Sequence, residues 1–414
     1  MTTFYIRSLG CKVSQYDGER IAEKLRKFGL EESEKQPDLF ILNGCSVTGR
    51  ASQKANQIIR AVRRGKADSK IVLAGCEARL VEKRHSNVPE VDWLLPYGDE
   101  ESLKKMMSAL SLDIKCCNEN QIKHAPVSDM TRAYLKVQDG CSQFCSYCIV
   151  AHLRGPEWSR PIEDAVKEAR ELVAEGHKEL VLAGIHVGHY KPSLVPLLKE
   201  LEKIEGLERI RLSSIESIEV KDELIEWMAT SPKSCHHFHI PLQSGCDKVL
   251  KGMHRPYVTA EFKAVIDHVR KTMPDAALTT DLIVGFPGET EEDFQETLNF
   301  LDEIKFSKIH IFRYSQRDGT PAATMPNQIR NEVKIERSDR VEAVWQKYAY
   351  EFFKKFEGRQ VEILWETIED GWIHGYSKEY VPCRMQCNDS AMCNTLMLAK
   401  GIKADKQGLL VERA

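Results

Sequence analysis

The chain has 414 residues, 42% of them hydrophobic and 29% charged, with 24 glycines and 16 prolines; this composition excludes disordered, collagen-like and coiled-coil proteins and predicts about two to four globular domains. The 59 basic and 62 acidic side chains give a formal charge of −3, which argues against binding polyanions over the entire surface but allows a local basic face. The 13 cysteines cannot all pair, and neither a signal-peptide-like start nor a run of about 18 apolar residues occurs, so we expect a cytoplasmic protein with reduced thiols and no membrane partner.

Residues 1–111 alternate short apolar segments with amphipathic ones, a rhythm typical of a parallel sheet covered by helices. Strands are predicted at 4–9, 39–42 and 71–74, with helices at 16–28 and 51–63. The periodicity fades over residues 112–130, which are therefore predicted to form a linker.

Residues 131–354 continue the alternation with six further strand and helix units. The strands are predicted at 134–137, 179–183, 209–212, 237–240, 278–284 and 308–312. Six units in this length predict an incomplete parallel barrel, with an active site at the carboxyl ends of its strands.

Residues 355–414 follow a long helix that ends near Phe356 and contain short segments separated by turns. Strands are predicted at 360–365, 372–376, 379–382 and 408–412. This pattern predicts a small antiparallel barrel. The whole chain is thus assigned to the α/β class, with a parallel N-terminal sheet, a partial six-unit barrel and a small C-terminal barrel.

Three cysteines, Cys11, Cys45 and Cys76, each stand just after a predicted strand of the N-terminal sheet and directly after a glycine. The carboxyl ends of neighbouring parallel strands share one edge of a sheet, so three thiolates can converge there on a metal or cluster. The alternative is that they are small side chains packed beneath loops.

A second group, Cys141, Cys145 and Cys148, forms a CxxxCxxC motif on the loop after the first barrel strand. Three thiolates can hold three corners of a [4Fe–4S] cluster and leave one iron open to a ligand. Zinc is the main competitor, but a structural zinc site needs four ligands, and no second cysteine pair adjoins the motif. His152 could supply a fourth ligand, although exposure on the loop is the simpler interpretation. A cluster is favoured.

This spacing at the mouth of a partial barrel resembles the radical S-adenosylmethionine (SAM) superfamily. The two cysteine groups and the terminal barrel together resemble the methylthiotransferases, which consist of an N-terminal methylthiotransferase domain, a radical SAM core and a TRAM domain. The corresponding limits here are 1–111, 131–354 and 355–414. Matching motifs run along the whole chain: LGCKV (9–13), NGCSVT (43–48), HIPLQSGCD (239–247), MHRPY (253–257), TDLIVGFPGET (280–290) and FRYSQRDGT (312–320).

The resemblance implies that Cys141, Cys145 and Cys148 bind the radical-generating [4Fe–4S] cluster, and that Cys11, Cys45 and Cys76 bind an auxiliary [4Fe–4S] cluster that provides sulfur. It also implies two SAM molecules per turnover, one as methyl donor and one as the source of a 5′-deoxyadenosyl radical. No catalytic side chain is assigned beyond the cluster ligands. Contacts with SAM are expected from Tyr147, Gly184, Glu216, Gln243, Ser244, Asp281, Gly285 and Phe286. For each of these, loop capping or packing is the alternative role.

The sequence around the first cysteine, GCKVSQYD, resembles the branch of the family that modifies N6-threonylcarbamoyladenosine at position 37 of tRNA. The resemblance thus implies a tRNA anticodon stem-loop as substrate, an electron donor of the flavodoxin or ferredoxin type, and a monomer. The alternatives are N6-isopentenyladenosine-37, an aspartate of a ribosomal protein, or a nonenzymatic iron–sulfur protein that binds RNA.

Electrostatic support for RNA binding is local. A basic run at Arg60, Arg63, Arg64, Lys66 and Lys70 suits phosphates, although a solvated face is equally compatible. The last 60 residues are slightly acidic, so shape, aromatic side chains such as Trp365 and Trp372, or the other domains are expected to carry more of the RNA binding than charge in this segment. Cys383, Cys387 and Cys393 could bind a metal, but incidental thiols are the favoured interpretation.

Overall fold

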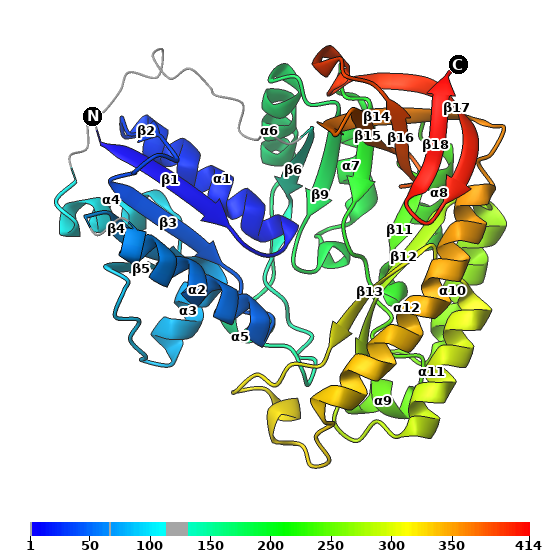
Figure 1. Ribbon diagram of the computed structural model, residues 1–414, viewed down its shortest axis with the longest axis horizontal. Helices are drawn as coiled ribbons and strands as arrows, with labels where there is room; N and C mark the ends of the chain where they lie inside the picture. Colours follow the sequence, from blue (N-terminus) through cyan, green and yellow to red (C-terminus); the bar gives the residue numbers. More distant parts are fainter. Residues whose placement is uncertain (1, 66–67, 113–130) are drawn as a thin grey trace.

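The computed structural model describes residues 2–65, 68–112 and 131–414, which form an N-terminal sheet, a partial barrel and a small closed barrel (Figure 1). Except for Leu112, the predicted linker at 112–130 lies outside the described residues. No helix within these three described ranges is long and apolar enough to cross a bilayer.

The N-terminal sheet is parallel throughout, with the strand order β2-β1-β3-β4-β5. Its elements are β1 (Thr3–Ser8), α1 (Lys12–Lys27), β2 (Glu31–Glu32), β3 (Leu39–Gly44), α2 (Gly49–Gly65), β4 (Lys70–Ala74), α3 (Gly75–Lys83), β5 (Trp93–Leu95) and α4 (Glu100–Ala109). Helices cover both faces, so β3 is buried along its length, with Ile41 in one core and Leu42 in the other. The three predicted strands are confirmed; β2 and β5 are too short to show periodicity.

The partial barrel contains all six predicted parallel strands, arranged in the order β6-β9-β10 and β11-β12-β13. Isolated parallel bridges from Ile210 to Ser234 and from Ser214 to His239 join the two halves. The strands are β6 (Arg132–Lys136), β9 (Glu179–Ala183), β10 (Arg209–Leu212), β11 (His237–His239), β12 (Ala277–Val284) and β13 (Lys308–Arg313). The principal helices are α6 (Ile162–Ala174), α7 (Leu194–Glu202), α8 (Asp222–Thr230), α10 (Thr259–Thr272), α11 (Glu291–Ile304) and α12 (Asn331–Lys354).

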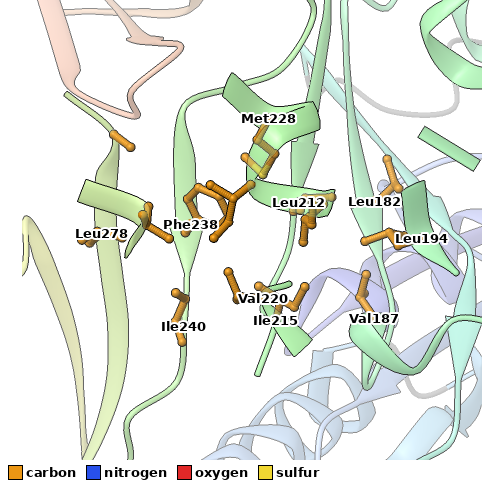
Figure 2. Packing of buried hydrophobic residues seen from close by; sticks show 14 of the residues in the cluster. Leu182, Val187, Leu194, Leu212, Ile215, Val220, Met228, Phe238, Ile240 and Leu278 are labelled. Atoms are coloured by element: carbon orange, nitrogen blue, oxygen red, sulfur yellow. The ribbon is translucent and has the colours of Figure 1, made fainter. Parts of the chain in front are cut away.

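One apolar core fills the space between the barrel strands and these helices. Figure 2 shows Leu182, Leu212 and Phe238 from successive strands, together with Leu194 and Met228 from the helices. Because such interiors are close-packed, this core holds the strand ends, and hence the loops that follow them, in fixed relative positions.

The C-terminal barrel is closed, with the strand order β14-β15-β16-β18-β17. Its strands are β14 (Gln360–Glu369), β15 (Trp372–Ser377), β16 (Pro382–Gln386), β17 (Leu396–Asp405) and β18 (Gly408–Arg413). Phe353 and Phe356, at the end of α12 and just after it, belong to its core. The predicted small barrel is therefore confirmed, and the long helix leads directly into it.

Three details of this barrel differ from the sequence-based expectation. The predicted strand at 379–382 is wrong, because Tyr380 has a left-handed backbone (φ 61°) and the strand begins only at Pro382. Strand β17 was not predicted, since a bulge between Gly401 and Lys403 breaks its alternation. The barrel is also not wholly antiparallel, because β16 and β18 pair in parallel.

Trp365 is wrongly placed among the aromatic side chains expected to contribute to RNA binding. Its side chain is completely buried in the core of the C-terminal barrel, where it packs with Ile363 and Phe353. Trp372 on β15 is half-buried and keeps an accessible edge.

Arginines on the strands of the partial barrel form ion pairs and hydrogen bonds with the C-terminal barrel. Arg132 pairs with Glu366 (Nε–Oε1 2.8 Å), and Arg209 donates to the Glu362 carbonyl (2.6 Å). Arg211 donates to the Ser377 carbonyl (3.3 Å) while it pairs with Glu179 (2.6 Å). Each of these three guanidinium groups at the interface between the two barrels therefore has a specific hydrogen-bonding partner.

The Glu179–Arg211 pair leads to a stability prediction, since both side chains are 1% exposed. Burial alone would raise the pKa of Glu179, but Arg211 outweighs it and holds the pKa below its usual range. The stabilisation from Glu179 is therefore present above the carboxyl's unfolded pKa of about 4.3 and is lost as the pH falls through the lower folded value.

Glu179→Leu is expected to lower the free energy of unfolding by about 3–5 kcal/mol at pH 7, because Arg211 stays buried without its carboxylate. Urea denaturation followed by circular dichroism measures the loss. The matched control is Glu200→Leu, at an exposed carboxylate paired with Lys203, where a change of at most about 0.5 kcal/mol is expected. Equal losses of unfolding free energy in the two variants would contradict a stabilising role for the buried Glu179–Arg211 pair.

Candidate active site

The first three cysteines converge at one edge of the N-terminal sheet. Cys11 follows β1, Cys45 follows β3 and Cys76 follows β4, and these three strands are neighbours. The Leu9 amide donates to the Asn43 carbonyl (2.8 Å), and a parallel bridge joins Gly44 to Gly75, so the pairing continues up to the cysteines. We call Cys11, Cys45 and Cys76 the sheet triad.

Glycine at position 10 is required by the close approach of two loops. Its φ is +113°, and a Cβ there would lie 2.6 Å from the Cβ of Cys45. Cys11 and Cys45 are thereby brought side by side.

The second three cysteines lie on the loop between β7 (Gln138–Asp139) and α5 (Val150–Arg154), and we call them the loop triad. The Cys148 amide donates to the Cys145 carbonyl (3.0 Å), which folds the motif into a tight turn. His186 Nδ1 lies 3.7 Å from the sulfur of Cys141, and Arg255 donates from Nη1 to the sulfur of Cys145 (3.2 Å). Cationic or donor groups thus face two of the three thiols.

The make-up of both triads suits clusters better than structural zinc ions. Three thiolates can hold a [4Fe–4S] cluster that keeps one iron open, whereas a structural zinc ion takes four ligands. Burial, together with the neighbouring Cys11 and Cys76, raises the pKa of Cys45 to about 11. Burial likewise raises the pKa of Cys148 to about 12. Three such thiols in one place suit iron, which stabilises their thiolate forms.

A cavity of about 170 Å³ lies between the N-terminal sheet and the mouth of the partial barrel. Cys148 and Tyr147 of the loop triad line it, together with Gln243 and Asp281 from the barrel. Its lining also includes Thr48, three residues after Cys45. The cavity is therefore bounded by part of the loop triad and by the segment that follows Cys45 of the sheet triad.

Arg154 connects the two triads. It ends α5, six residues after Cys148, and its Nε donates to the sulfur of Cys76 (3.3 Å). Its Nη1 pairs with Asp17 on α1 (2.8 Å) and with Asp139 on β7 (3.0 Å), and the side chain is only 2% exposed. This buried guanidinium fixes the N-terminal sheet against the loop that carries the second triad.

Of the residues expected to contact SAM, Tyr147, Gln243 and Asp281 line the cavity. Gly184 follows β9 and is not in the cavity lining; a Cβ there would stand 2.9 Å from Gln138 Oε1. Glu216 pairs with the buried Arg255, and burial raises the pKa of Glu216 although Arg255 opposes the rise.

The remaining three are placed away from the cavity wall. Ser244 is fully buried and accepts a hydrogen bond from the Cys246 amide (3.2 Å). Gly285 (φ +73°) donates to Glu289 (2.7 Å), and Phe286 packs edge-on against Tyr314 at a centroid distance of 5.8 Å. These contacts support the loops that carry Gln243 and the end of β12.

Two polar residues beside the loop triad were not singled out from sequence. Arg255 belongs to the MHRPY motif, but the chain offers no sign that it reaches Cys145. His186 joins Cys141 to Glu219 (Nε2–Oε1 2.7 Å) and stacks on His189 at 3.8 Å. A single histidine after a predicted strand does not indicate a functional role in the sequence. His186 is recognised only in the folded structure, where the loop after β9 lies against the loop triad.

The structure also shows the surroundings of the basic run and of the cysteines in the C-terminal barrel. In the basic run, Arg63 is held by Asp92 (2.5 Å) and Arg60 by Glu90 (3.3 Å), and Lys66 lies outside the described residues. Cys383 is buried inside the C-terminal barrel, while the Cys387 sulfur contacts the sulfur of Met392 at 3.4 Å.

Comparison with known proteins agrees with this arrangement. The description of the radical SAM superfamily matches residues 135–301, and that of "Uncharacterized protein family UPF0004" matches residues 3–95. The radical SAM methyltransferase TsrM from Kitasatospora setae, solved with cobalamin and a [4Fe–4S] cluster, superimposes with a TM-score of 0.58 over 78% of this chain and 77% of that one, at 14% identity. The fold and the CxxxCxxC loop define a radical SAM enzyme, which uses a [4Fe–4S] cluster and SAM.

Relatives over the full length narrow this class. "Threonylcarbamoyladenosine tRNA methylthiotransferase MtaB" of Bacillus subtilis is 38% identical over 92% of this chain and 90% of its own, and its namesake in Thermotoga maritima is 36% identical over 92% and 91%. A "tRNA-2-methylthio-N(6)-dimethylallyladenosine synthase" of Syntrophus aciditrophicus is 32% identical over 99% and 92%. The chain belongs to the radical SAM methylthiotransferase family.

Proposed function

We propose that this protein converts N6-threonylcarbamoyladenosine at position 37 of tRNA to its 2-methylthio derivative. The two relatives named for that activity are 36–38% identical over 92% of the chain, which supports this substrate over the dimethylallyl one. The observation that carries the proposal is a cavity lined by Cys148 of the loop triad and by Thr48, three residues after Cys45 of the sheet triad, because sulfur insertion needs a sulfur source and a radical source within reach of the same carbon.

The cofactor assignment follows the two triads. Cys141, Cys145 and Cys148 would hold the [4Fe–4S] cluster that binds and reductively cleaves SAM, and Cys11, Cys45 and Cys76 would hold a second [4Fe–4S] cluster that supplies sulfur. Tyr147, Gln243 and Asp281 are in position to bind SAM in the cavity.

Two arginine side chains hold cysteines of the two triads in position. Arg255 donates to the sulfur of Cys145 while its other Nη pairs with Glu216, and Arg154 donates to the sulfur of Cys76. Hydrogen bonds to a ligating thiolate tune its basicity and fix its direction.

Overall, the C2–H bond of adenosine is replaced by C2–S–CH₃. The sulfur would come from the second cluster, the methyl group would come from one SAM, which leaves as S-adenosylhomocysteine, and the hydrogen atom would leave as part of 5′-deoxyadenosine formed with methionine from a second SAM. One electron from a donor would start the cleavage of that second SAM, and one electron would be given back when the carbon radical at C2 bonds to sulfide-level sulfur, so the overall reaction consumes no net electrons. Radical chemistry suits this carbon, since it has neither an acidic proton nor a leaving group.

We further assign residues 1–111, 131–354 and 355–414 to the methylthiotransferase, radical SAM and TRAM domains. The break between α12 and β14 supports the limit near residue 355. A tRNA substrate implies a cytoplasmic location, and we infer a monomer served by a flavodoxin- or ferredoxin-type electron donor.

The proposal is tested with anaerobically reconstituted protein, SAM, a strong reductant and tRNA bearing either modified adenosine. Nucleoside mass spectrometry is expected to detect 2-methylthio-N6-threonylcarbamoyladenosine and no 2-methylthio-N6-isopentenyladenosine. The reverse pattern would assign the other substrate, and 5′-deoxyadenosine without any methylthio nucleoside would reject tRNA as substrate.

A further inference from the structure

Polar side chains gather on one face of the neighbouring strands β11 and β12. His237 and His239 lie two residues apart on β11, and Thr279 and Asp281 have the same spacing on β12. Because successive side chains of a strand point to opposite faces, all four share the face opposite to Phe238, which belongs to the apolar core. His239 and Thr279 are register partners in the parallel pairing. The two strands therefore bring two imidazoles, a hydroxyl and a carboxylate together.

The imidazole of His239 lies between Thr279 and Asp281. Its Nδ1 is 2.9 Å from Thr279 Oγ1, and its Nε2 is 3.2 Å from Asp281 Oδ1. A carboxylate can only accept hydrogen bonds, so the ring nitrogen that faces Asp281 must carry a proton. Thr279 thus fixes one side of the ring, and the other side presents an N–H group to the carboxylate.

Thr279 is itself held by a second imidazole. Its Oγ1 lies 2.8 Å from His237 Nε2, and His237 stacks on Tyr380 of the C-terminal barrel at a centroid distance of 4.5 Å. Both Thr279 and His237 are buried. The group that orients His239 is therefore rigid, because buried side chains with specific partners keep one orientation.

Asp281 carries this arrangement to the cavity. Of the described residues that line the cavity, it is the only acidic one. SAM presents ribose hydroxyls and a positively charged sulfonium, both of which a carboxylate attracts. In the part of the chain that the structure describes, no basic side chain other than His239 lies within ion-pair distance of Asp281. The orientation of this carboxylate therefore depends on His239.

We propose that His239 is a positioning residue that holds the Asp281 carboxylate in the orientation that binds SAM. The inference rests on the part of the proposed function in which the cavity binds SAM. His239 and Thr279 are not in the cavity lining, so His239 acts through Asp281. Without it the carboxylate would rotate about its own side-chain bonds, and SAM binding would have to order it.

The test measures SAM binding without turnover. Radiolabelled SAM is titrated by equilibrium dialysis into the full-length, anaerobically reconstituted protein, without reductant and without RNA. His239→Asn, which keeps an amide near Thr279 but is too short to reach Asp281, is expected to weaken SAM binding by about 10-fold. His239→Gln is long enough to donate to Asp281 and is expected to stay within about 2-fold of the wild type.

A double-mutant cycle distinguishes positioning from a merely structural role. Asp281→Asn alone is expected to weaken SAM binding by about 10- to 100-fold, and adding His239→Asn should weaken it by less than about 2-fold more. A structural role would instead multiply the two losses. Multiplied losses, or wild-type affinity in either single variant, would overturn the inference.

Thr279→Val is the second variant, since it removes the hydroxyl that holds the ring and leaves His239 in place. It is expected to weaken SAM binding by about 3- to 10-fold, and it takes the place of His239→Asn in the cycle if that variant does not retain its iron.

His268→Asn is the matched control. His268 lies on α10, is half exposed, and stands 3.6 Å from an aspartate, Asp222. The same replacement there is expected to leave SAM affinity unchanged. Failure of the proposed function looks different, because the wild-type protein itself would then bind no SAM or would methylthiolate no tRNA.

Discussion

A Cys145→Ala variant is expected to form no detectable 5′-deoxyadenosine and to bind about four rather than about eight iron atoms per chain. Cys145 is the central cysteine of the loop triad and accepts a hydrogen bond from the buried Arg255. Without it, only two thiolates remain on that loop, too few to retain a cluster that must keep one iron open for SAM. Methylthiolation should be lost together with SAM cleavage.

The measurements are an iron assay and chromatographic quantification of 5′-deoxyadenosine after anaerobic reconstitution. Cys387→Ala is the matched control, because its sulfur contacts Met392 in the C-terminal barrel, remote from either triad in the chain. Full iron content in Cys145→Ala, or loss of iron in Cys387→Ala, would refute the ligand assignment.

A Cys45→Ala variant is expected to lose the methylthio product completely while it continues to cleave SAM. Cys45 belongs to the sheet triad, three residues before Thr48 of the cavity lining, so its removal should eliminate the second cluster and leave the first intact. Iron content should again fall to about four atoms per chain, but here 5′-deoxyadenosine should still accumulate.

The two variants together separate the roles of the triads. Identical phenotypes, with SAM cleavage lost in both, would mean that the sheet triad does not hold an independent cluster. Retention of methylthiolation in Cys45→Ala would exclude the sheet triad as the sulfur source.

The sequence predicted the cysteine geometry well, for a physical reason. Cys11, Cys45 and Cys76 follow strands whose burial on both faces shows in their continuous apolar character, and parallel strands bring their ends to one edge. The loop triad is local in sequence, so its spacing alone constrains it. All six barrel strands were likewise predicted, because each is a short apolar segment between amphipathic helices.

The contacts that complete the site could not be predicted in this way. Arg154 reaches Cys76 only because the N-terminal sheet and the partial barrel dock in one particular way. Periodicity describes the burial of a residue within its own element but carries no information about partners far away in sequence. Trp365 was misassigned for a similar reason, since a tryptophan on a short strand is equally compatible with either face of a barrel.

The arginines at the base of the partial barrel also limit how this architecture can be rearranged by recombination. Arg132 and Arg209 find their acceptors, Glu366 and Glu362, on the C-terminal barrel. Consider a hybrid protein whose C-terminal barrel comes from a relative without these acidic residues. In it, Arg132 and Arg209 would lose these carboxylate partners. Recombination is therefore expected to exchange the partial barrel and the C-terminal barrel together, even though each has its own apolar core.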